Sequence, residues 1–424
     1  MARKMKDSGI EWIGEIPEGW EIKYFVQLFS QVKSKNIGLR EKNLLSLSYG
    51  KIKQKSIETV GGLLPDNFEG YNIIDRNDIV LRLTDLQNDQ HSLRVGLSHE
   101  RGIITSAYCS IRVRGAESPN YLYYYLHTFD IAKGFYGMGS GVRQGLNWDG
   151  LKYIKILLPP QHEQDRISVF LNQKTLEIDS MLSKTISSIE EYKKLKQAVI
   201  TQAVTKGVRG EREMKDSGVE WIREIPVDWE ISRIKYVSIF EPSCDFKKLT
   251  PETIITYSPM ECIKNGTFER RTSLYGNLAH TLTPFQNGDI VMAKVTPCFE
   301  NGNIAIMNEL QSGYGLGSSE LFVFRPQNIN TRYLFYWLQN KLFVHQACAT
   351  MTGTGGLKRI SPSFVKNCNI HYPSAAEQAQ IAAYLDAKCA EIDGLIAKKE
   401  QLVKELESYK KSLIYEVVTG KREV

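Results

Sequence analysis

Two long stretches of the chain place apolar residues at the spacing of an amphipathic helix. Steps of three, four or seven residues separate most apolar positions, and Lys, Glu and Gln occupy the other face, which is typical of a coiled-coil seam. The expected seam residues are Ile167, Leu171, Ile178, Leu182, Ile189, Leu195, Val199 and Ala203, and then Ile381, Leu385, Ile392, Ile396, Val403, Tyr409, Leu413 and Val417. Ser374 and Glu377 form a capping box at the start of the second stretch. Gly207 and Gly420 stand where the two helices should end.

The two stretches belong to an internal repeat that covers the chain. The number of residues that separates Ile167 from Ile381 also separates every other seam residue of the first stretch from its counterpart in the second. Another pair of segments, residues 5–22 and 214–231, is identical at fourteen of eighteen positions. Such agreement within one chain indicates that one structural unit has been duplicated. Each copy therefore has a matching opening, a divergent middle and a matching closing helix.

The divergent middles have the pattern of mixed α/β globules. Short β-rich runs at residues 78–83 and 289–293 follow turn signals. Aromatic runs at residues 121–126 and 333–338 have helical spacing and occupy equivalent places in the two copies. Such rings either pack in a core or stack on nucleic-acid bases, and the helical spacing favours the core.

Two homologous helices in one chain should pair with each other, because an isolated helix would leave its apolar stripe in water. A pseudo-two-fold axis through the pair makes the helices antiparallel and predicts that the globules lie at opposite ends. The predicted fold class is α+β, with two α/β domains separated by two long antiparallel coiled-coil helices. The expected segments are a first domain (1–160), a central helix (161–207), a second domain (208–372) and a C-terminal helix (373–424).

Composition narrows the class of protein without identifying it. A net charge of +6 on 424 residues permits nucleic-acid binding but is too small to indicate it. The seven cysteines are scattered and form no CxxC pair, which argues against a disulfide framework and a zinc module. No run of 18 uninterrupted apolar residues occurs, so we expect a cytoplasmic protein with no membrane association.

Three features of the chain resemble the specificity subunits of Type I restriction–modification systems. They are the opening KDSGIEWIGEIPEGWE with its repeat KDSGVEWIREIPVDWE, the string GGLKRISPSF at residues 355–364, and the order of domain, helix, domain and helix. The first copy departs from this pattern, because GLNWD stands at residues 145–149 where the second copy has RISPS. That difference leaves the local turn of the first copy open.

The resemblance implies a function and a set of partners. Each middle would be a target-recognition domain that reads one half of an asymmetric, bipartite site on double-stranded DNA. The helices would set the spacer and dock two modification subunits, which bind S-adenosylmethionine and methylate adenine. Restriction subunits would add translocation and cleavage that need ATP and Mg²⁺, and this chain would hold no cofactor. A related specificity subunit for an enzyme that cuts beside its site fits the sequence too.

Catalytic signals in the chain are weak. Residues 135–139 (FYGMG) fit the FxGxG shape of an S-adenosylmethionine loop, but no [DN]PP[FYW] tetrapeptide accompanies them. The chain has no P-loop and no HExxH spacing, and Pro65-Asp66 is not followed by the ExK of a nuclease. We therefore expect no catalytic residue and no metal site. A self-contained adenine methyltransferase and a coiled-coil scaffold with no nucleic-acid role are the alternatives.

Contacts with DNA are expected in the divergent middles. Lysines at every second position of a strand share one face and can neutralise phosphates, although they also protect a solvated edge strand. Arg and Gln just after a glycine turn can approach base edges. The candidate contact residues are Lys51, Lys53, Lys55, Arg143, Gln144, Lys264, Arg270, Arg271, Lys358 and Arg359.

Overall fold

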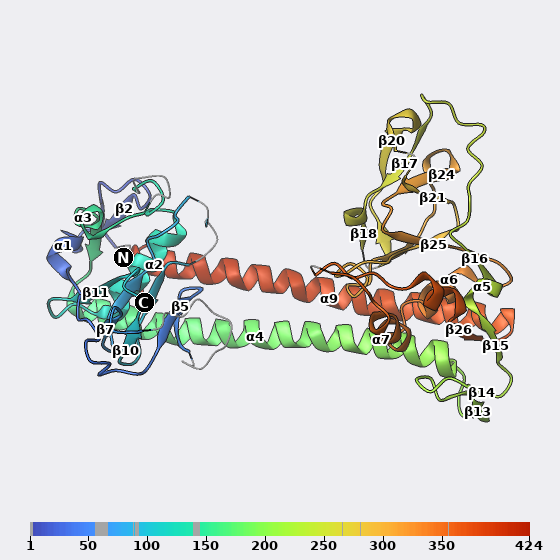
Figure 1. Ribbon diagram of the computed structural model, residues 1–424. Coiled ribbons are helices and arrows are strands. Elements are labelled where there is room, and N and C mark those ends of the chain that lie inside the picture. Colours follow the sequence, from blue (N-terminus) through green and yellow to red (C-terminus); the bar gives the residue numbers. More distant parts are fainter. Residues whose placement is uncertain are drawn as a thin grey trace. The chain divides into compact units, whose positions relative to one another are not determined.

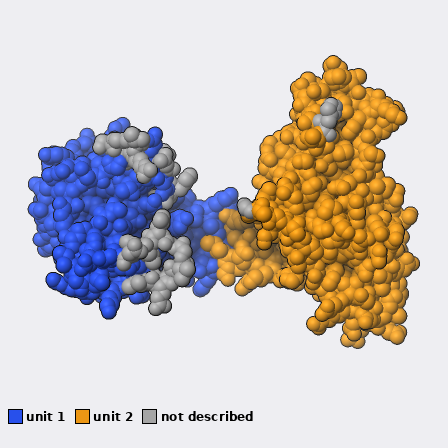
Figure 2. Space-filling view, in the orientation of Figure 1, with its two compact units in different colours: residues 1–185, 401–424 blue, residues 186–400 orange. Residues whose placement is uncertain are grey.

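The computed structural model divides the chain into two compact units. The described residues are 3–55, 67–87, 89, 93–138, 145–264, 266–279, 281–354 and 356–424. Unit 1 contains residues 1–185 and 401–424, and unit 2 contains residues 186–400 (Figure 2). Each unit combines one globular region with one half of each long helix, α4 (Gln161–Lys206) and α9 (Ala375–Val418). The predicted division into four segments stays a prediction.

The globular regions consist of short strands and a few helices. Those of unit 1 are β1 (Met5–Asp7), β2 (Glu15–Pro17), β3 (Glu21–Tyr24), α1 (Phe25–Leu28), β4 (Phe29–Gln31), β5 (Leu45–Ser48), β6 (Lys51–Gln54), β7 (Asn72–Ile74), β8 (Ile79–Leu81), β9 (Val95–Leu97), β10 (Gly102–Ile104), β11 (Cys109–Val113), α2 (Pro119–Ile131), α3 (Trp148–Leu151) and β12 (Lys155–Leu158). Those of unit 2 are β13 (Met214–Asp216), β14 (Glu224–Pro226), β15 (Glu230–Arg233), α5 (Ile234–Val237), β16 (Ser238–Phe240), β17 (Ile254–Ser258), β18 (Ile263–Lys264), β19 (Thr267–Phe268), β20 (Arg271–Leu274), β21 (Thr283–Gln286), β22 (Ile290–Ala293), β23 (Ile304–Ile306), β24 (Tyr314–Gly317), β25 (Leu321–Pro326), α6 (Thr331–Trp337), α7 (Lys341–Ala349), α8 (Pro362–Asn367) and β26 (Asn369–Tyr372).

The same set of sheets recurs in both units. A four-stranded antiparallel sheet with the order β4-β11-β8-β9 in unit 1 has its counterpart in β16-β25-β22-β23 of unit 2. The pairs β1-β2 and β3-β12 correspond to β13-β14 and β15-β26. The runs at 78–83 and 289–293, predicted as strands, supply β8 and β22, and these two inner strands are fully buried.

We call these recurring sheets the shared frame. Outside the shared frame the two units differ. Unit 1 adds the hairpin β5-β6 and the pair β7-β10. Unit 2 instead adds the sheet β20-β17-β24-β21, in which β17 and β24 are parallel, and the short hairpin β18-β19. The divergence of the middle sequences therefore corresponds to different added strands on a common frame.

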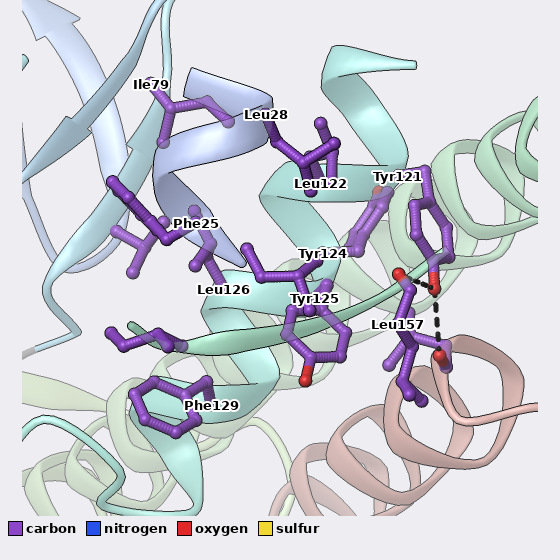
Figure 3. Close-up of a cluster of buried hydrophobic side chains, with 14 of the residues drawn as sticks. Phe25, Leu28, Ile79, Tyr121, Leu122, Tyr124, Tyr125, Leu126, Phe129 and Leu157 are labelled. Atoms are coloured by element: carbon purple, nitrogen blue, oxygen red, sulfur yellow. Dashed lines mark hydrogen bonds between the residues drawn. The ribbon is translucent and has the colours of Figure 1, made fainter. Parts of the chain in front are cut away.

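Helices α2 and α6 bury the aromatic runs. Figure 3 shows Tyr121, Tyr124 and Tyr125 of α2 within a cluster of buried side chains in unit 1. The buried Tyr121 hydroxyl lies 3.1 Å from the Leu157 carbonyl oxygen and 3.2 Å from that of Val418, and it donates to both. The prediction of core packing is confirmed, because these rings are not accessible to bases.

The corresponding tyrosine of unit 2 makes the corresponding contacts. The buried Tyr333 hydroxyl donates to the carbonyl oxygens of His371 (2.7 Å) and Val204 (3.3 Å). Val204 and Val418 occupy equivalent positions in α4 and α9, because the offset of the repeat relates one to the other. In each unit, one aromatic residue of the globular region therefore binds the C-terminal turn of the helix that comes from the other copy.

The two long helices run antiparallel within each unit (Figure 1). In unit 1 the Lys410 ammonium lies 2.5 Å from the Asp179 carboxylate. In unit 2 the Lys196 ammonium lies 2.7 Å from the Asp393 carboxylate. The second pair repeats the first with the two helices exchanged, at the same offset as the seam residues. The predicted antiparallel pairing is therefore confirmed within each unit, and the same helix contact recurs in both units.

The seam between the helices is apolar. Its buried members are Ile167, Leu171, Ile178, Ile189, Ala203, Ile381, Leu385, Ile392, Leu413 and Val417, and its half-buried members are Leu182, Val199, Ile396 and Val403. The prediction is wrong for Leu195 and Tyr409, which are 48% and 49% exposed. A step of six residues from Ile189 turns a side chain about 120° away from the seam. Ile200 and Ile414 are buried instead.

The ends of the long helices agree with the sequence in part. Gly207 and Gly420 have φ angles of +80° and +73°, so each helix ends on a left-handed glycine as predicted. The Ser374 hydroxyl accepts from the Glu377 backbone N–H at 3.5 Å, which is one half of the predicted capping box. The other half is wrong, because the Glu377 carboxylate instead accepts from the Arg212 guanidinium at 2.6 Å.

The matching opening segments hold the first turn of each long helix. The Trp20 indole N–H donates to the Glu163 carboxylate at 2.8 Å, and Arg3 pairs with the same carboxylate. Arg212 and Glu377 form the equivalent ion pair of unit 2. Burial opposes ionisation of Glu163, but the hydrogen bonds from Arg3 and Trp20 outweigh it and lower the pKa of the carboxyl. A carboxylate at this end also interacts favourably with the helix dipole.

Replacing Tyr121 by Phe tests the bond between α2 and the end of α9. Loss of the buried hydroxyl should lower the free energy of unfolding by about 1–3 kcal/mol, because a buried hydrogen bond is lost and a carbonyl oxygen is left unpaired. Denaturant unfolding followed by circular dichroism measures the change. The matched control is Tyr153→Phe, at a tyrosine that is 78% exposed, and equal stability of the two variants would contradict the role of the Tyr121 hydroxyl.

Candidate nucleic-acid interface

The hairpin of β5 and β6 carries the predicted lysines of unit 1. Lys51 and Lys53 are exposed on β6, while Ile52 between them packs against a buried cluster. Lys55 follows the strand, and its backbone N–H donates to the Leu44 carbonyl at 2.8 Å. The strand covers Lys51 and Lys53 of the predicted alternation, whereas Lys55 lies beyond its end. Whether these lysines contact DNA stays a prediction.

Lys51 differs from the other two lysines because it has an acidic partner. Its ammonium lies 2.8 Å from Asp179 of α4, which also pairs with Lys410. Burial opposes ionisation of Asp179, but hydrogen bonds from Lys410 and Lys51 lower the pKa of this carboxyl. No ion pair of Lys53 or Lys55 occurs among the described residues. Lys53 and Lys55 are therefore better placed to neutralise a phosphate.

The predicted basic cluster of unit 2 is largely neutralised by acidic neighbours. Arg270 pairs with Glu309, and the Arg271 guanidinium lies 3.0 Å from Glu269 and 3.2 Å from Glu261. These partners leave both arginines with less net charge for a phosphate. Lys264 on β18 is exposed. Among the three candidates of this cluster, Lys264 is the one whose ammonium makes no ion pair within the described chain.

The glycine turn of unit 2 packs beside the loop that follows β22. Gly353 has a φ of +148°, and a Cβ at this position would lie 2.2 Å from the Leu357 oxygen, so the turn requires glycine. The Thr296 backbone N–H donates to the Lys358 carbonyl at 3.0 Å, and the Thr296 hydroxyl accepts from the Lys358 N–H at 2.9 Å. Lys358 thus projects from a backbone that is fixed while its side chain is exposed.

Arg359, the next residue, is exposed, but its guanidinium already has an acidic partner. Its guanidinium donates twice to the Glu320 carboxylate, at 2.9 and 2.7 Å. These hydrogen bonds lower the pKa of Glu320. Pairing with a guanine edge would require Arg359 to leave this carboxylate. The corresponding candidates of unit 1, Arg143 and Gln144, lie outside the described residues.

The segments GLNWD and RISPS each supply an N-cap residue for a short helix despite their different sequences. Asn147 caps α3 by accepting from the Gly150 N–H at 3.1 Å. Ser361 caps α8 by accepting from the Phe364 N–H at 3.4 Å. The offset of the repeat relates the two caps to each other. The first copy therefore keeps the helix cap of the second copy, although a different residue type supplies it.

Arg94 positions a loop of unit 1, and no sequence pattern pointed to it. It is fully buried, and its guanidinium donates to the carbonyls of Arg82 (3.1 Å) and Thr84 (2.9 Å) and to the Tyr136 hydroxyl (3.1 Å). Its backbone N–H donates to Asp130 at 2.7 Å, and burial raises the pKa of that carboxyl to about 6. Backbone carbonyls carry no sequence pattern, so an arginine that binds them is not recognisable from the sequence.

Comparison with known proteins gives a consistent family. The family described as Type I restriction modification DNA specificity domain matches residues 226–405. The Type I restriction enzyme EcoEI specificity subunit of Escherichia coli is 32% identical over 163 residues, which are 37% of this chain and only 27% of that protein. The putative type I restriction enzyme MjaX specificity subunit of Methanocaldococcus jannaschii is 25% identical over 430 aligned positions, covering 96% of this chain and 95% of that protein.

Solved structures show the same fold. A chain from a structure titled for complex assembly and conformational transition of the type I R-M system has a TM-score of 0.70, at 15% identity, over 96% of this chain and 99% of that one. The HsdS subunit from Thermoanaerobacter tengcongensis has a TM-score of 0.51, also at 15% identity, over 96% and 98%.

The chain is similar to Type I restriction–modification specificity subunits, and residues 226–405 match their DNA specificity domain.

The segment suggested as an S-adenosylmethionine loop has the wrong surroundings for that role. Phe135 is fully buried in the core, and the segment follows helix α2 rather than a strand. Gly139, the last glycine of that motif, and Pro65-Asp66 lie outside the described residues. Over the described ranges, no group of three or more His, Cys, Asp or Glu side chains is arranged to hold a metal ion. No helix in the same ranges is long and apolar enough to span a bilayer.

Neutralising Lys53 or Lys358 tests the predicted phosphate contacts of the chain. Lys53→Gln and Lys358→Gln should each reduce the slope of log affinity for duplex DNA against log salt concentration by about 1, because one counterion fewer is released. Fluorescence anisotropy at several salt concentrations measures the slope. Lys398→Gln, on the exposed part of α9, is the control and should leave the slope unchanged. If neither variant changes the slope, these lysines do not contact phosphate.

Proposed function

We propose that this chain is the DNA-recognition subunit of a Type I restriction–modification complex and has no active site of its own. Each globular region reads one half of an asymmetric, bipartite site on double-stranded DNA. The observation that best supports this proposal is the repetition of the same helix attachment in both units, where the ion pair of Asp179 and Lys410 recurs as that of Asp393 and Lys196. Two related domains on paired helices suit a target with two half-sites.

The two half-sites are expected to differ from each other. The shared frame gives both globular regions the same attachment to the helices, but the added strands differ in number and order. The exposed lysines of unit 1 lie on the hairpin β5-β6, whereas Lys358 of unit 2 follows a glycine turn. Different surfaces on a common frame support recognition of different bases.

The long helices are proposed to set the spacer and to bind partner subunits. Val169 and Leu176 on α4 are 68% and 69% exposed and are separated by one heptad, so they share one face of the helix in unit 1. Exposed apolar residues at this spacing suit a partner protein better than solvent. We propose two modification subunits as these partners, with S-adenosylmethionine bound to them. ATP and Mg²⁺ would belong to the restriction subunits.

Adding the partner subunits tests the proposed role directly. The purified chain alone should transfer no methyl group from labelled S-adenosylmethionine to DNA. The chain with two modification subunits should methylate adenine in a split sequence, because the catalytic residues are on the partners. Sequencing that detects methylated adenine identifies the site. Methylation by the chain alone, or methylation by the modification subunits without it, would refute the proposal.

Lengthening both helices tests the role of the spacer. Four residues inserted after Ser183 and four after Glu405 keep the α4–α9 pairing in register, because these positions are opposite each other when Asp179 faces Lys410. One helical turn adds about 5.4 Å, and a base pair rises about 3.4 Å, so the preferred spacer should lengthen by about one to two base pairs. Methylation of targets with graded spacers measures the change. An unchanged preferred spacer would show that the length of the helices does not set the spacer.

A further inference from the structure

Unit 1 contains a cavity whose wall includes neither Lys53 nor Lys55, the lysines of this unit that are best placed to contact DNA. Its volume is about 870 Å³, and its walls come from the hairpin β5-β6, helix α2 and the halves of α4 and α9 that belong to this unit. This volume lies in the range of small-molecule binding sites. Apolar residues such as Leu176, Leu182 and Ile414 form part of the wall.

The wall carries an excess of positive charge. Its ionised side chains are Lys51, Arg76, Lys410, Lys411, Asp179 and Glu407. Four cations and two carboxylates leave a net charge of +2. Asp179 is already shared by Lys51 and Lys410. Arg76 and Lys411 make no ion pair within the described chain, so their charges are available to an anionic ligand.

A buried histidine adds a hydrogen-bonding group without a partner. His127 is 8% exposed and lines the cavity, and its Nδ1 atom has no hydrogen-bond partner among the described residues. The Tyr123 ring stacks on it, with centroids 5.7 Å apart and planes at 30°. Burial, with Lys410 and Lys411 nearby, lowers the pKa of His127 to about 4, so the imidazole is neutral at pH 7. A buried nitrogen without a partner is unfavourable unless something binds it.

The second copy lacks these features at the equivalent positions. Gln339, which follows α6, replaces His127 and donates to the Phe335 carbonyl of that helix at 3.1 Å. Gln197 replaces Lys411 on the partner helix. The polar groups that lack partners in unit 1 are thus absent from unit 2, although the frame around them is the same.

The remaining polar groups of that region in unit 2 also satisfy each other. Arg332 donates to Asp386 at 2.6 Å, whereas the equivalent residues in unit 1, Asn120 and Asn172, are uncharged, line the cavity and form a weaker hydrogen bond of 3.4 Å with each other. The repeat therefore acts as an internal comparison. Features needed for the shared fold are present in both copies. The unpaired cations and the imidazole of the cavity occur in unit 1 alone, so the shared fold does not explain them.

We propose that this cavity binds a nucleoside monophosphate. The phosphate would be held by Lys411 and Arg76, and the base would lie among Tyr123, His127 and the amides of the wall. A flat heteroaromatic ring with hydrogen-bonding edges matches stacked rings and a neutral imidazole, and a phosphate matches the surplus of cations. The nucleotide is either free or an unstacked unit of a single DNA strand. The inference stands independently of the proposed DNA-reading function.

Calorimetric titration of the complete chain with adenosine 5′-monophosphate tests the proposal. We expect one saturable site, with adenosine and inorganic phosphate binding at least tenfold more weakly, because each lacks one half of the ligand. A single-stranded oligonucleotide that displaces the monophosphate would identify a DNA strand as the source. An oligonucleotide that does not displace it would identify the free nucleotide.

Variants that install the residues of the second copy locate the site. Lys411→Gln and His127→Gln should each weaken binding of the monophosphate at least tenfold. Lys404→Gln, also exposed on α9 but outside the cavity wall, should leave it unchanged. Thermal melting of each variant confirms that it is folded. Absence of saturable binding to the unaltered chain, equal binding of inorganic phosphate, or unchanged affinity in both folded variants would overturn the proposal.

Discussion

The antiparallel pairing of α4 and α9 is the interaction on which the remaining structure depends. Neither helix is apolar all round, so each needs the other, and the globular regions, to cover its apolar stripe. Leu171 joins the core of unit 1 and Leu385 joins the core of unit 2, and both are fully buried. Burial of one such side chain contributes about 1.5–3 kcal/mol. The helices are therefore part of both cores, and a globular region without them would expose its apolar interior.

This dependence explains which parts of the two copies match. The opening segments hold the first turn of the helices through Glu163 and Glu377, and Tyr121 and Tyr333 hold the last turns. These contacts must recur in each copy, because each copy must join the same pair of helices. The strands beyond the frame carry no such requirement. They are free to differ, and they differ in order and number.

Features with a local period could be predicted from the sequence, and contacts between distant segments could not. The constant offset between the copies, the seam and the buried aromatic helices follow from spacing alone. Leu195 and Tyr409 were misplaced because a six-residue step departs from the face of the helix. The bond of Arg359 to Glu320 and the role of Arg94 depend on groups brought together by the fold, for which a sequence has no local signal. The cavity could not be predicted for the same reason, because segments distant in the sequence form its wall.

The division of the helices between the units has a consequence for biosynthesis. Unit 2 consists of one continuous stretch, residues 186–400, and all of it is translated before residues 401–424. Unit 1 starts earlier in the chain, but its core also needs Leu413 and Val418, which are made only after the whole of unit 2. The core of unit 1 therefore cannot be completed until the end of α9 has been synthesised. Of the two units, the one that begins first along the chain is completed last.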